Sequence, residues 1–202
     1  MKKRVIAITQ RLAIQENYQE RREILACEWG EFFNKSNILP LPLSYAIPIE
    51  QYAQIIHGVI LSGGNDLSIF SKDVNSLIRD EYERSVIEFC FSNAMPLLGV
   101  CRGAQMIAHY FNSSLCKIGG HVGEHNIIWN NRDEERVNSF HHYQILRLGD
   151  DLESQAIGKD RGIEAFSHKR LPIFGMMWHP EREKKNTKST LRVFENFLEK
   201  IR

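Results

Sequence analysis

The 202-residue sequence predicts an α/β protein with a doubly wound, mostly parallel sheet and antiparallel additions. Short, almost continuous apolar runs of strand length alternate with segments in which apolar residues recur at helical spacing. Strands that are apolar on both faces are typical of a parallel sheet covered by helices on both sides. After residue 114 the apolar runs become shorter, which indicates antiparallel strands. No Gly/Ser/Pro-rich linker divides the chain, so we expect a single domain over residues 1–202.

The first half of the chain supplies four of the expected strands. They are Val5–Thr9, Ile38–Leu43, His57–Leu61 and Leu97–Val100. Residues 18–34 place Leu25, Trp29, Phe32 and Phe33 on one helical face, and residues 80–93 place Tyr82, Val86, Ile87 and Phe89 at helical spacing. This periodicity predicts a helix over each segment. A third helix is expected over residues 106–111, after the fourth strand.

The second half is expected to contain shorter strands and a last helix. The antiparallel additions are predicted at Ile127–Trp129, Ile145–Leu148 and Ile163–Phe166. Ile173–Met177 is apolar again and is expected to return to the buried sheet. From about Ser189, apolar residues on one stripe predict a C-terminal helix.

Composition excludes some functions. A net charge of +1 and a pI near 7.7 argue against nucleic acid as the main partner, because proteins that bind it are usually more basic. No apolar run approaches the roughly 20 residues that span a bilayer, so no membrane partner is expected. The apolar run after Met1–Arg4 has only the length of a strand, which argues against a signal peptide and for a cytoplasmic protein. The oligomeric state is left open.

The cysteines differ in their surroundings. Cys27, Cys90, Cys101 and Cys116 show no C-x-x-C spacing, which argues against a zinc site or a disulfide framework. We expect Cys27, Cys90 and Cys116 to be small buried hydrophobic residues. Cys101 differs, because it ends an apolar run, has Gly99 and Gly103 beside it and precedes a helical segment. A tight turn of this kind needs small neighbours, and the start of a helix stabilises a thiolate.

A histidine and a carboxylate that could activate this thiol follow far downstream, at His179 and Glu181 within Met177-Trp178-His179-Pro180-Glu181. A thiol, an imidazole that takes its proton and a carboxylate that orients the imidazole form a nucleophilic triad. Ser62–Gly64, Cys101 and His179 each come just after an expected strand. Because ligands bind at the carboxyl ends of strands in doubly wound sheets, these residues are expected to meet there.

Four motifs in this order carry a resemblance to a known family. They are Leu61-Ser62-Gly63-Gly64-Asn65-Asp66, Gly99-Val100-Cys101-Arg102-Gly103-Ala104-Gln105, Asn138-Ser139-Phe140-His141-His142 and Trp178-His179-Pro180-Glu181. Together they resemble the class I glutamine amidotransferase-like superfamily, and its γ-glutamyl hydrolase branch in particular. The resemblance implies a flavodoxin-like fold and the catalytic residues Cys101, His179 and Glu181.

The same resemblance implies how a substrate would be held. The N–H groups of Arg102 and Gly64 would stabilise the oxyanion, and Gln105 would contact the glutamyl group. The backbone of Ser139, Phe140 and His141 would receive the α-carboxylate. No cofactor or metal is implied. Whether His142 contacts the substrate or packs within its loop is left open. Arg79-Asp80-Glu81-Tyr82 resembles an R-D-x-Y/E segment common in the hydrolase branch, but it could equally be a helix start with Asp80 near the cap.

The chemistry that follows is release of glutamate from a γ-glutamyl amide or phosphoramidate through a γ-glutamyl thioester. The resemblance extends to cleavage of γ-glutamyl-CDP-amidate to cytidine diphosphoramidate in capsule biosynthesis. If the basic segment 182–188 is functional rather than a solvated loop, it would favour such a phosphate-bearing leaving group. The alternative is a glutaminase subunit that supplies ammonia to a separate synthetase.

One further motif suggests different chemistry. His121-Val122-Gly123-Glu124-His125 matches the H-x-x-E-H pattern of zinc peptidases. That pattern needs both histidines on one face of a helix. Gly119, Gly120 and Gly123 make a helix improbable here, so the metallopeptidase using His121, Glu124 and His125 is only a remote alternative.

Overall fold

A mixed sheet of eleven strands dominates residues 3–119 and 122–201, which are the residues that the computed structural model describes. One half of it, the parallel half, has the order β4 (Ile38–Pro42), β1 (Arg4–Ile8), β5 (Gly58–Leu61), β6 (Leu97–Val100) and β13 (Ile173–Met176). All neighbours within it are parallel. The expected α/β fold with a mostly parallel core sheet is therefore confirmed.

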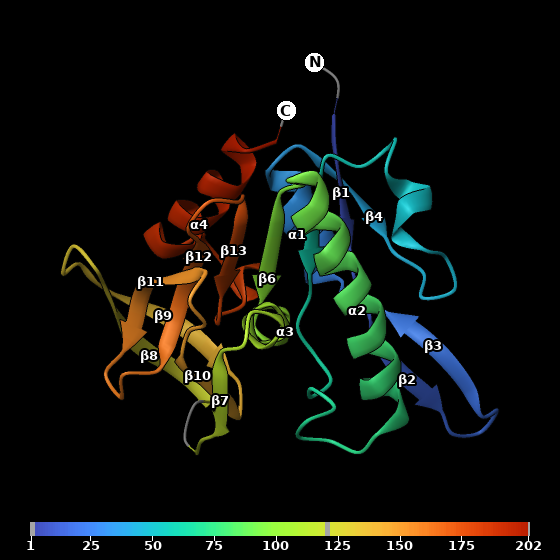
Figure 1. The fold of residues 1–202 in the computed structure, drawn as a ribbon, viewed down its shortest axis with the longest axis horizontal. Helices are drawn as coiled ribbons and strands as arrows, with labels where there is room; N and C mark the ends of the chain where they lie inside the picture. Colours follow the sequence, from blue (N-terminus) through green and yellow to red (C-terminus); the bar gives the residue numbers. More distant parts are fainter. Residues whose placement is uncertain (1–2, 120–121, 202) are drawn as a thin grey trace.

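The antiparallel half continues the sheet from β13. Its order is β12 (Ile163–His168), β11 (Leu152–Gly158), β8 (Val122–Trp129) and β9 (Glu134–Phe140), with β10 (Tyr143–Arg147) pairing both β12 and β7 (Ser114–Lys117). Figure 1 shows these strands gathered on the side of the molecule away from β1 and β4. The predicted strands Ile127–Trp129 and Ile163–Phe166 lie within β8 and β12, and the predicted strand Ile145–Leu148 overlaps β10, which ends one residue earlier. The sequence analysis did not predict β7, β9 and β11, so it did not anticipate that the motif residues 138–140 end a strand, β9.

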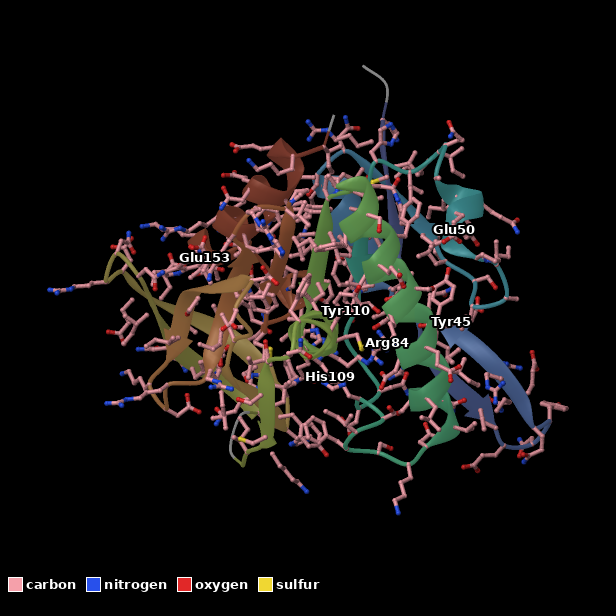
Figure 2. The ribbon with its side chains drawn as sticks, in the orientation of Figure 1. Tyr45, Glu50, Arg84, His109, Tyr110 and Glu153 are labelled. Carbon is pink, nitrogen blue, oxygen red and sulfur yellow. The ribbon has the colours of Figure 1, made fainter. Side chains whose placement is uncertain are left out.

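Four helices cover the two faces of the parallel half. α1 (Glu28–Lys35) and α4 (Lys188–Glu199) pack against one face through residues such as Phe33 and Phe194. α2 (Val74–Asn93) and α3 (Arg102–Tyr110) pack against the other face. Arg84 of α2 lies over the ring of Tyr110 of α3, 5.8 Å from its centroid, and both are labelled in Figure 2. Two short 3₁₀ segments are η1 (Ile49–Tyr52) and η2 (Pro180–Arg182).

The helix expected over residues 18–34 is wrong in its first part. Residues 11–24 form the hairpin of β2 (Arg11–Gln15) and β3 (Glu20–Ile24), and α1 begins only at Glu28. The apolar residues that gave the helical pattern lie between 25 and 33, whereas residues 20–23 are charged and exposed. They offer no apolar face to a helix, and they pair instead as the second strand of a hairpin whose first strand, β2, packs beside α2 (Figure 1).

The three cysteines expected to be buried differ in their exposure to solvent. Cys90 is buried on α2, and burial raises the pKa of its thiol. Cys27 is exposed, because it precedes the first turn of α1 and its side chain does not share the buried face of that helix. Cys116 is half-buried. Among the described helices, none combines the length and apolar character needed to cross a bilayer.

Candidate active site

The carboxyl edge of the parallel half brings together residues that are far apart in the sequence. Arg11 follows β1, Gly63 and Gly64 follow β5, Cys101 follows β6, and His179 lies just past β13. Because β1, β5, β6 and β13 lie side by side and point the same way, these residues meet at one end of the sheet.

Cys101 occupies a sharp turn between β6 and α3. Its φ of 52° and ψ of −108° are unusual for a residue with a side chain, and its N–H donates to the Met176 carbonyl at 2.8 Å. The glycines beside it allow this turn. A Cβ on Gly103 would lie 2.0 Å from the Leu61 carbonyl oxygen, and one on Gly99 would lie 2.6 Å from the Gly103 carbonyl. The geometry therefore explains why a glycine stands on each side.

His179 is held by Glu181 on one side and faces Cys101 on the other. Its Nδ1 lies 2.7 Å from Glu181 Oε1, and both side chains are buried. Burial opposes the charged ring, but the Cys101 sulfur and the Glu181 carboxylate outweigh it and raise the pKa of His179 to about 9. At neutral pH the ring therefore favours the imidazolium form, which can stabilise a thiolate and later donate a proton.

The loop after β5 packs directly against this imidazole. A Cβ on Gly63 would lie 2.7 Å from His179 Cε1, so a side chain there would displace the ring. Gly64 has a φ of 88°, which favours glycine. This loop and the first turn of α3, which begins at Arg102, converge beside Cys101. The first N–H groups of a helix have no partner within it, so this turn offers donors to an anion.

A buried ionic network that includes Arg79 and Asp80 holds the same loop. The Arg79 guanidinium donates to the Ser62 carbonyl at 2.6 Å and to the Gly63 and Gly64 carbonyls at 3.0 Å. It also donates to Glu83 Oε1 at 2.9 Å. The Arg102 side chain pairs with Glu83 and Asp80. These side chains therefore position the loop and the start of α3. Because α2 begins at Val74, Arg79 and Asp80 lie inside the helix, and the helix start that the sequence also allowed at this segment is wrong.

A pocket of about 220 Å³, the Cys101 pocket, is lined by Cys101 and lies beside the start of α3. Its walls are formed by Gly64, Asn65, Asp66, Cys101, Arg102, Gln105, Phe140, His141, His142 and Tyr143. Gln105 is anchored by a hydrogen bond from its amide to the Tyr143 carbonyl at 3.0 Å. Ser139 is buried on β9, and it is not among the described residues that line this pocket. Asp66, which the sequence analysis missed, is an exposed carboxylate in it.

A second pocket of about 150 Å³, the His179 pocket, shares Gly64 with the first. Its walls are formed by Arg11, Ile24, Leu25, Ala26, Trp29, Ser62, Gly63, Gly64, His179, Glu181 and Arg182. Arg11 comes from the start of the β2–β3 hairpin, which the sequence analysis did not predict. Lys184 and Lys185 of the basic segment are exposed and lie outside this wall.

The antiparallel half touches the site through the end of β9. Asn138 Oδ1 accepts a hydrogen bond from the His179 N–H at 2.9 Å, and Asn138 Nδ2 donates to the His179 carbonyl at 2.8 Å. The Phe140 ring lies edge-on to the His179 ring with centroids 5.7 Å apart, and the Arg182 guanidinium covers it at 4.5 Å. Asn138 therefore holds the backbone of His179, a role that its motif alone did not indicate.

The remaining histidines lie nearby. His141 is buried with its Nδ1 3.0 Å from the Tyr143 carbonyl, whereas His142 is exposed. Of the zinc-peptidase motif, His121 lies outside the described residues, and Glu124 and His125 lie on strand β8. Neighbouring residues of a strand point to opposite faces, and Glu124 pairs with Arg136 while His125 pairs with Glu164. The helical face that zinc-peptidase chemistry needs is not formed by these residues.

Comparison with known proteins agrees with this geometry. Residues 13–201 match the family model described as glutamine amidotransferase class-I. The chain belongs to this family. A solved amidotransferase from Thermotoga maritima shares the fold with a TM-score of 0.71 and 18% identity, over 99% of this chain and 86% of that one. The resemblance identified from the four motifs is thus confirmed.

Two amidotransferase relatives bear on activity. A γ-glutamyl-CDP-amidate hydrolase from Campylobacter jejuni is 48% identical over 98% of this chain and 98% of its own. One subunit of the glutamine-hydrolysing GMP synthase from Methanospirillum hungatei is 31% identical over 75% of this chain and 77% of its own. The name of the first relative agrees with the hydrolase expected from the sequence, and the more distant one belongs to a glutamine-hydrolysing synthetase.

Proposed function

We propose that this protein hydrolyses a γ-glutamyl amide or phosphoramidate through a Cys101 thioester. The observation that carries this proposal is the alignment of Cys101, His179 and Glu181 at the carboxyl edge of the sheet, with Glu181 2.7 Å from one ring nitrogen and the thiol at the other. Such an alignment activates a sulfur nucleophile for acyl transfer.

In the first half of the reaction the Cys101 thiolate attacks the γ-carbonyl carbon of the substrate. The new C–S bond places a negative charge on the carbonyl oxygen, which the N–H groups of Arg102 and Gly64 are placed to receive. The C–N bond then breaks. The electron pair leaves with the nitrogen, which takes its proton from the His179 imidazolium, and the thioester remains.

The second half reverses the role of His179. The neutral imidazole now takes a proton from water, and the hydroxide attacks the thioester carbonyl. Collapse of the second tetrahedral intermediate breaks the C–S bond, releases glutamate and restores the thiolate next to the imidazolium. Glu181 keeps the ring in one orientation through both halves, so that the same nitrogen serves as acid and base.

The Cys101 pocket suits the glutamyl group itself. Asp66 supplies a carboxylate for the α-ammonium, and Gln105, fixed by Tyr143, presents its amide oxygen. The α-carboxylate would lie against the backbone from Ser139 to His141, as the resemblance implies. The buried side chain of Ser139 and the pocket wall formed by Phe140 and His141 support backbone rather than side-chain recognition by this segment.

The identity of the leaving group rests on the relative named γ-glutamyl-CDP-amidate hydrolase, whose match spans nearly both chains. We infer a nucleotide-linked substrate, from which the reaction would release glutamate and cytidine diphosphoramidate. The reduced thiol that this chemistry needs fits the cytoplasmic location expected from the sequence. The second candidate, a glutaminase subunit for a separate synthetase, is favoured by the similarity to the GMP synthase from Methanospirillum hungatei.

Glutamate release from the purified chain tests these alternatives. The substrates are γ-glutamyl-CDP-amidate, a neutral γ-glutamyl anilide, glutamine, and the glutaryl anilide that lacks the α-amino group. We expect efficient hydrolysis of the first, slower hydrolysis of the second, and poor hydrolysis of the last two. Efficient glutaminase activity that increases when a synthetase is added would instead establish the second candidate. Rapid hydrolysis of the glutaryl compound would contradict the role of Asp66.

A further inference from the structure

The two pockets at the candidate active site are lined by different members of the proposed catalytic triad. Cys101 lines one pocket and His179 lines the other, and Gly64 lines both. In acyl transfer the nucleophile touches the acyl group, the acid touches the leaving group and the oxyanion lies between them. The Cys101 pocket is therefore on the acyl side of the reacting carbonyl, and the His179 pocket is on the leaving-group side.

Charged side chains of opposite sign line these two pockets. The Cys101 pocket contains the carboxylate of Asp66, whereas Arg102 beside it is committed to Asp80 and Glu83. The His179 pocket contains the guanidiniums of Arg11 and Arg182. The site is thus complementary to a substrate that carries an ammonium group on its acyl side and negative charge on its leaving-group side.

The two arginines are available for such a ligand. Among the described residues no carboxylate forms an ion pair with Arg11, whose side chain lies across Gly64, with carbons 3.2 Å from the place of a Cβ there. Arg182 is 42% exposed and lies 3.7 Å from Glu181, but that carboxylate is engaged by His179 at 2.7 Å. Arg182 is instead positioned by the face of Phe140.

We propose that Arg11, at the start of β2, and Arg182, in η2, bind the phosphate groups of the leaving group in the His179 pocket. This inference rests on the proposed hydrolase function and assigns the recognition of its leaving group. A planar guanidinium presents several donors that match phosphate oxygens. The nitrogen attached to that phosphate then lies on the side where His179 delivers its proton. Of the basic segment 182–188, the proposal assigns phosphate binding to Arg182 and not to Lys184 or Lys185, because these two lysines lie outside the pocket wall.

A substrate comparison tests this proposal. Arg11→Gln and Arg182→Gln are assayed with γ-glutamyl-CDP-amidate and with the neutral γ-glutamyl anilide, and the readout is the ratio of the two kcat/KM values. We expect each variant to lower this ratio by about tenfold, because each removes a charge-assisted contact that only the phosphate compound makes. Arg22→Gln on the same hairpin and Lys185→Gln on the same segment are the controls, and both should leave the ratio unchanged.

Binding of the leaving group alone provides a second measurement that needs no turnover. Calorimetry with inorganic pyrophosphate, CDP and cytidine should show binding of the first two and none of the third, with weaker binding in both arginine variants. Cytidine binding equal to that of CDP, or an unchanged substrate ratio in both variants, would overturn the proposal. If the wild-type chain binds pyrophosphate but hydrolyses neither substrate, the proposed function is wrong while the phosphate site stands.

Discussion

The two halves of the sheet contribute to the active site in different ways. The parallel half supplies Cys101, His179 and the Gly63–Gly64 loop from the ends of buried strands. Arg79 of α2 holds that loop by a hydrogen bond to the Gly63 carbonyl. The antiparallel half supplies the end of β9, where Asn138 contacts only the backbone of His179 and Phe140 forms an exposed wall. The comparison indicates that the proposed catalytic residues lie in the parallel half, whereas the antiparallel half contributes supporting hydrogen bonds and part of the pocket wall.

The largest effect should come from removing the nucleophile in the parallel half. Cys101→Ala should lower kcat by roughly 10⁴-fold or more, because the remaining groups act only together with it. Iodoacetamide should inactivate the wild-type enzyme, and substrate should protect it. Cys116→Ala, a half-buried cysteine of the antiparallel half, is the control and should remain active. Resistance to iodoacetamide combined with inactivation by EDTA would place the chemistry elsewhere and revive a metal-dependent mechanism.

The next largest effect should come from removing Arg79, the buried side chain that holds the Gly63–Gly64 loop. Arg79→Gln removes a buried partner of Glu83 and three contacts to loop carbonyls, which should destabilise the fold by about 3–5 kcal/mol and lower Tm by roughly 10 °C. At a temperature where the variant remains folded, kcat should still fall by about 100-fold, because the Gly64 N–H, the proposed oxyanion donor of this loop, is misplaced.

Arg84→Gln is the matched control for this change. It removes the same charge from an exposed position of the same helix and should alter Tm and kcat little. Wild-type kcat in the Arg79 variant would show that the loop is held without this network, and the parallel half would lose part of its assigned role.

An intermediate effect is expected for Glu181→Gln, and it should change the pH profile. In the wild type, activity should fall as pH rises through about 9, where His179 loses the proton that the leaving nitrogen needs. The Glu181 carboxylate helps to raise that pKa, so its removal should shift the alkaline limb to lower pH and reduce kcat by roughly 10- to 100-fold. Glu195→Gln, an exposed position on α4, should leave the profile unchanged. An unshifted limb would show that Glu181 does not act on His179.

The smallest effect should come from the antiparallel half. Asn138→Ala removes both hydrogen bonds to the His179 backbone, and we expect kcat to fall by about tenfold while the pH profile stays in place. Asn126→Ala, which removes an exposed contact to Glu134 on the same hairpin, is the control. A loss comparable to that of Cys101→Ala would erase the distinction between the two halves.

The same contrast explains what could be predicted from the sequence. The parallel strands were found because successive residues such as Ile60 and Leu61, or Leu97 and Leu98, are buried against opposite faces of the sheet, so each strand is a continuous apolar run. The motifs at their ends followed directly, since Cys101 and His179 lie where such runs stop. In the antiparallel half, β9 alternates buried and partly exposed residues within a largely polar sequence, which has no clear apolar signal.

The residues that were missed depend on contacts between distant segments. Arg11 reaches the site because β2 and β3 form a hairpin, yet residues 20–23 carry the charges of an ordinary solvated helix face. Asn138 is recognisable as part of a motif, but its bonds to His179 span 41 residues of sequence and have no local pattern. Asp66 stands beside the Gly63–Gly64 loop, and only its place in the folded pocket distinguishes it from an ordinary surface carboxylate.

Glu83 shows how closely the site is tied to global folding. One of its carboxylate oxygens accepts hydrogen bonds from Thr9 and Arg79, and the other meets Arg102. Thr9 follows β1, and Arg102 follows β6, so this side chain joins segments that come together only when the sheet forms. The loop amides near Gly63 should therefore exchange with deuterium only when the parallel half opens as a unit, and during denaturation catalytic competence and sheet structure should disappear together.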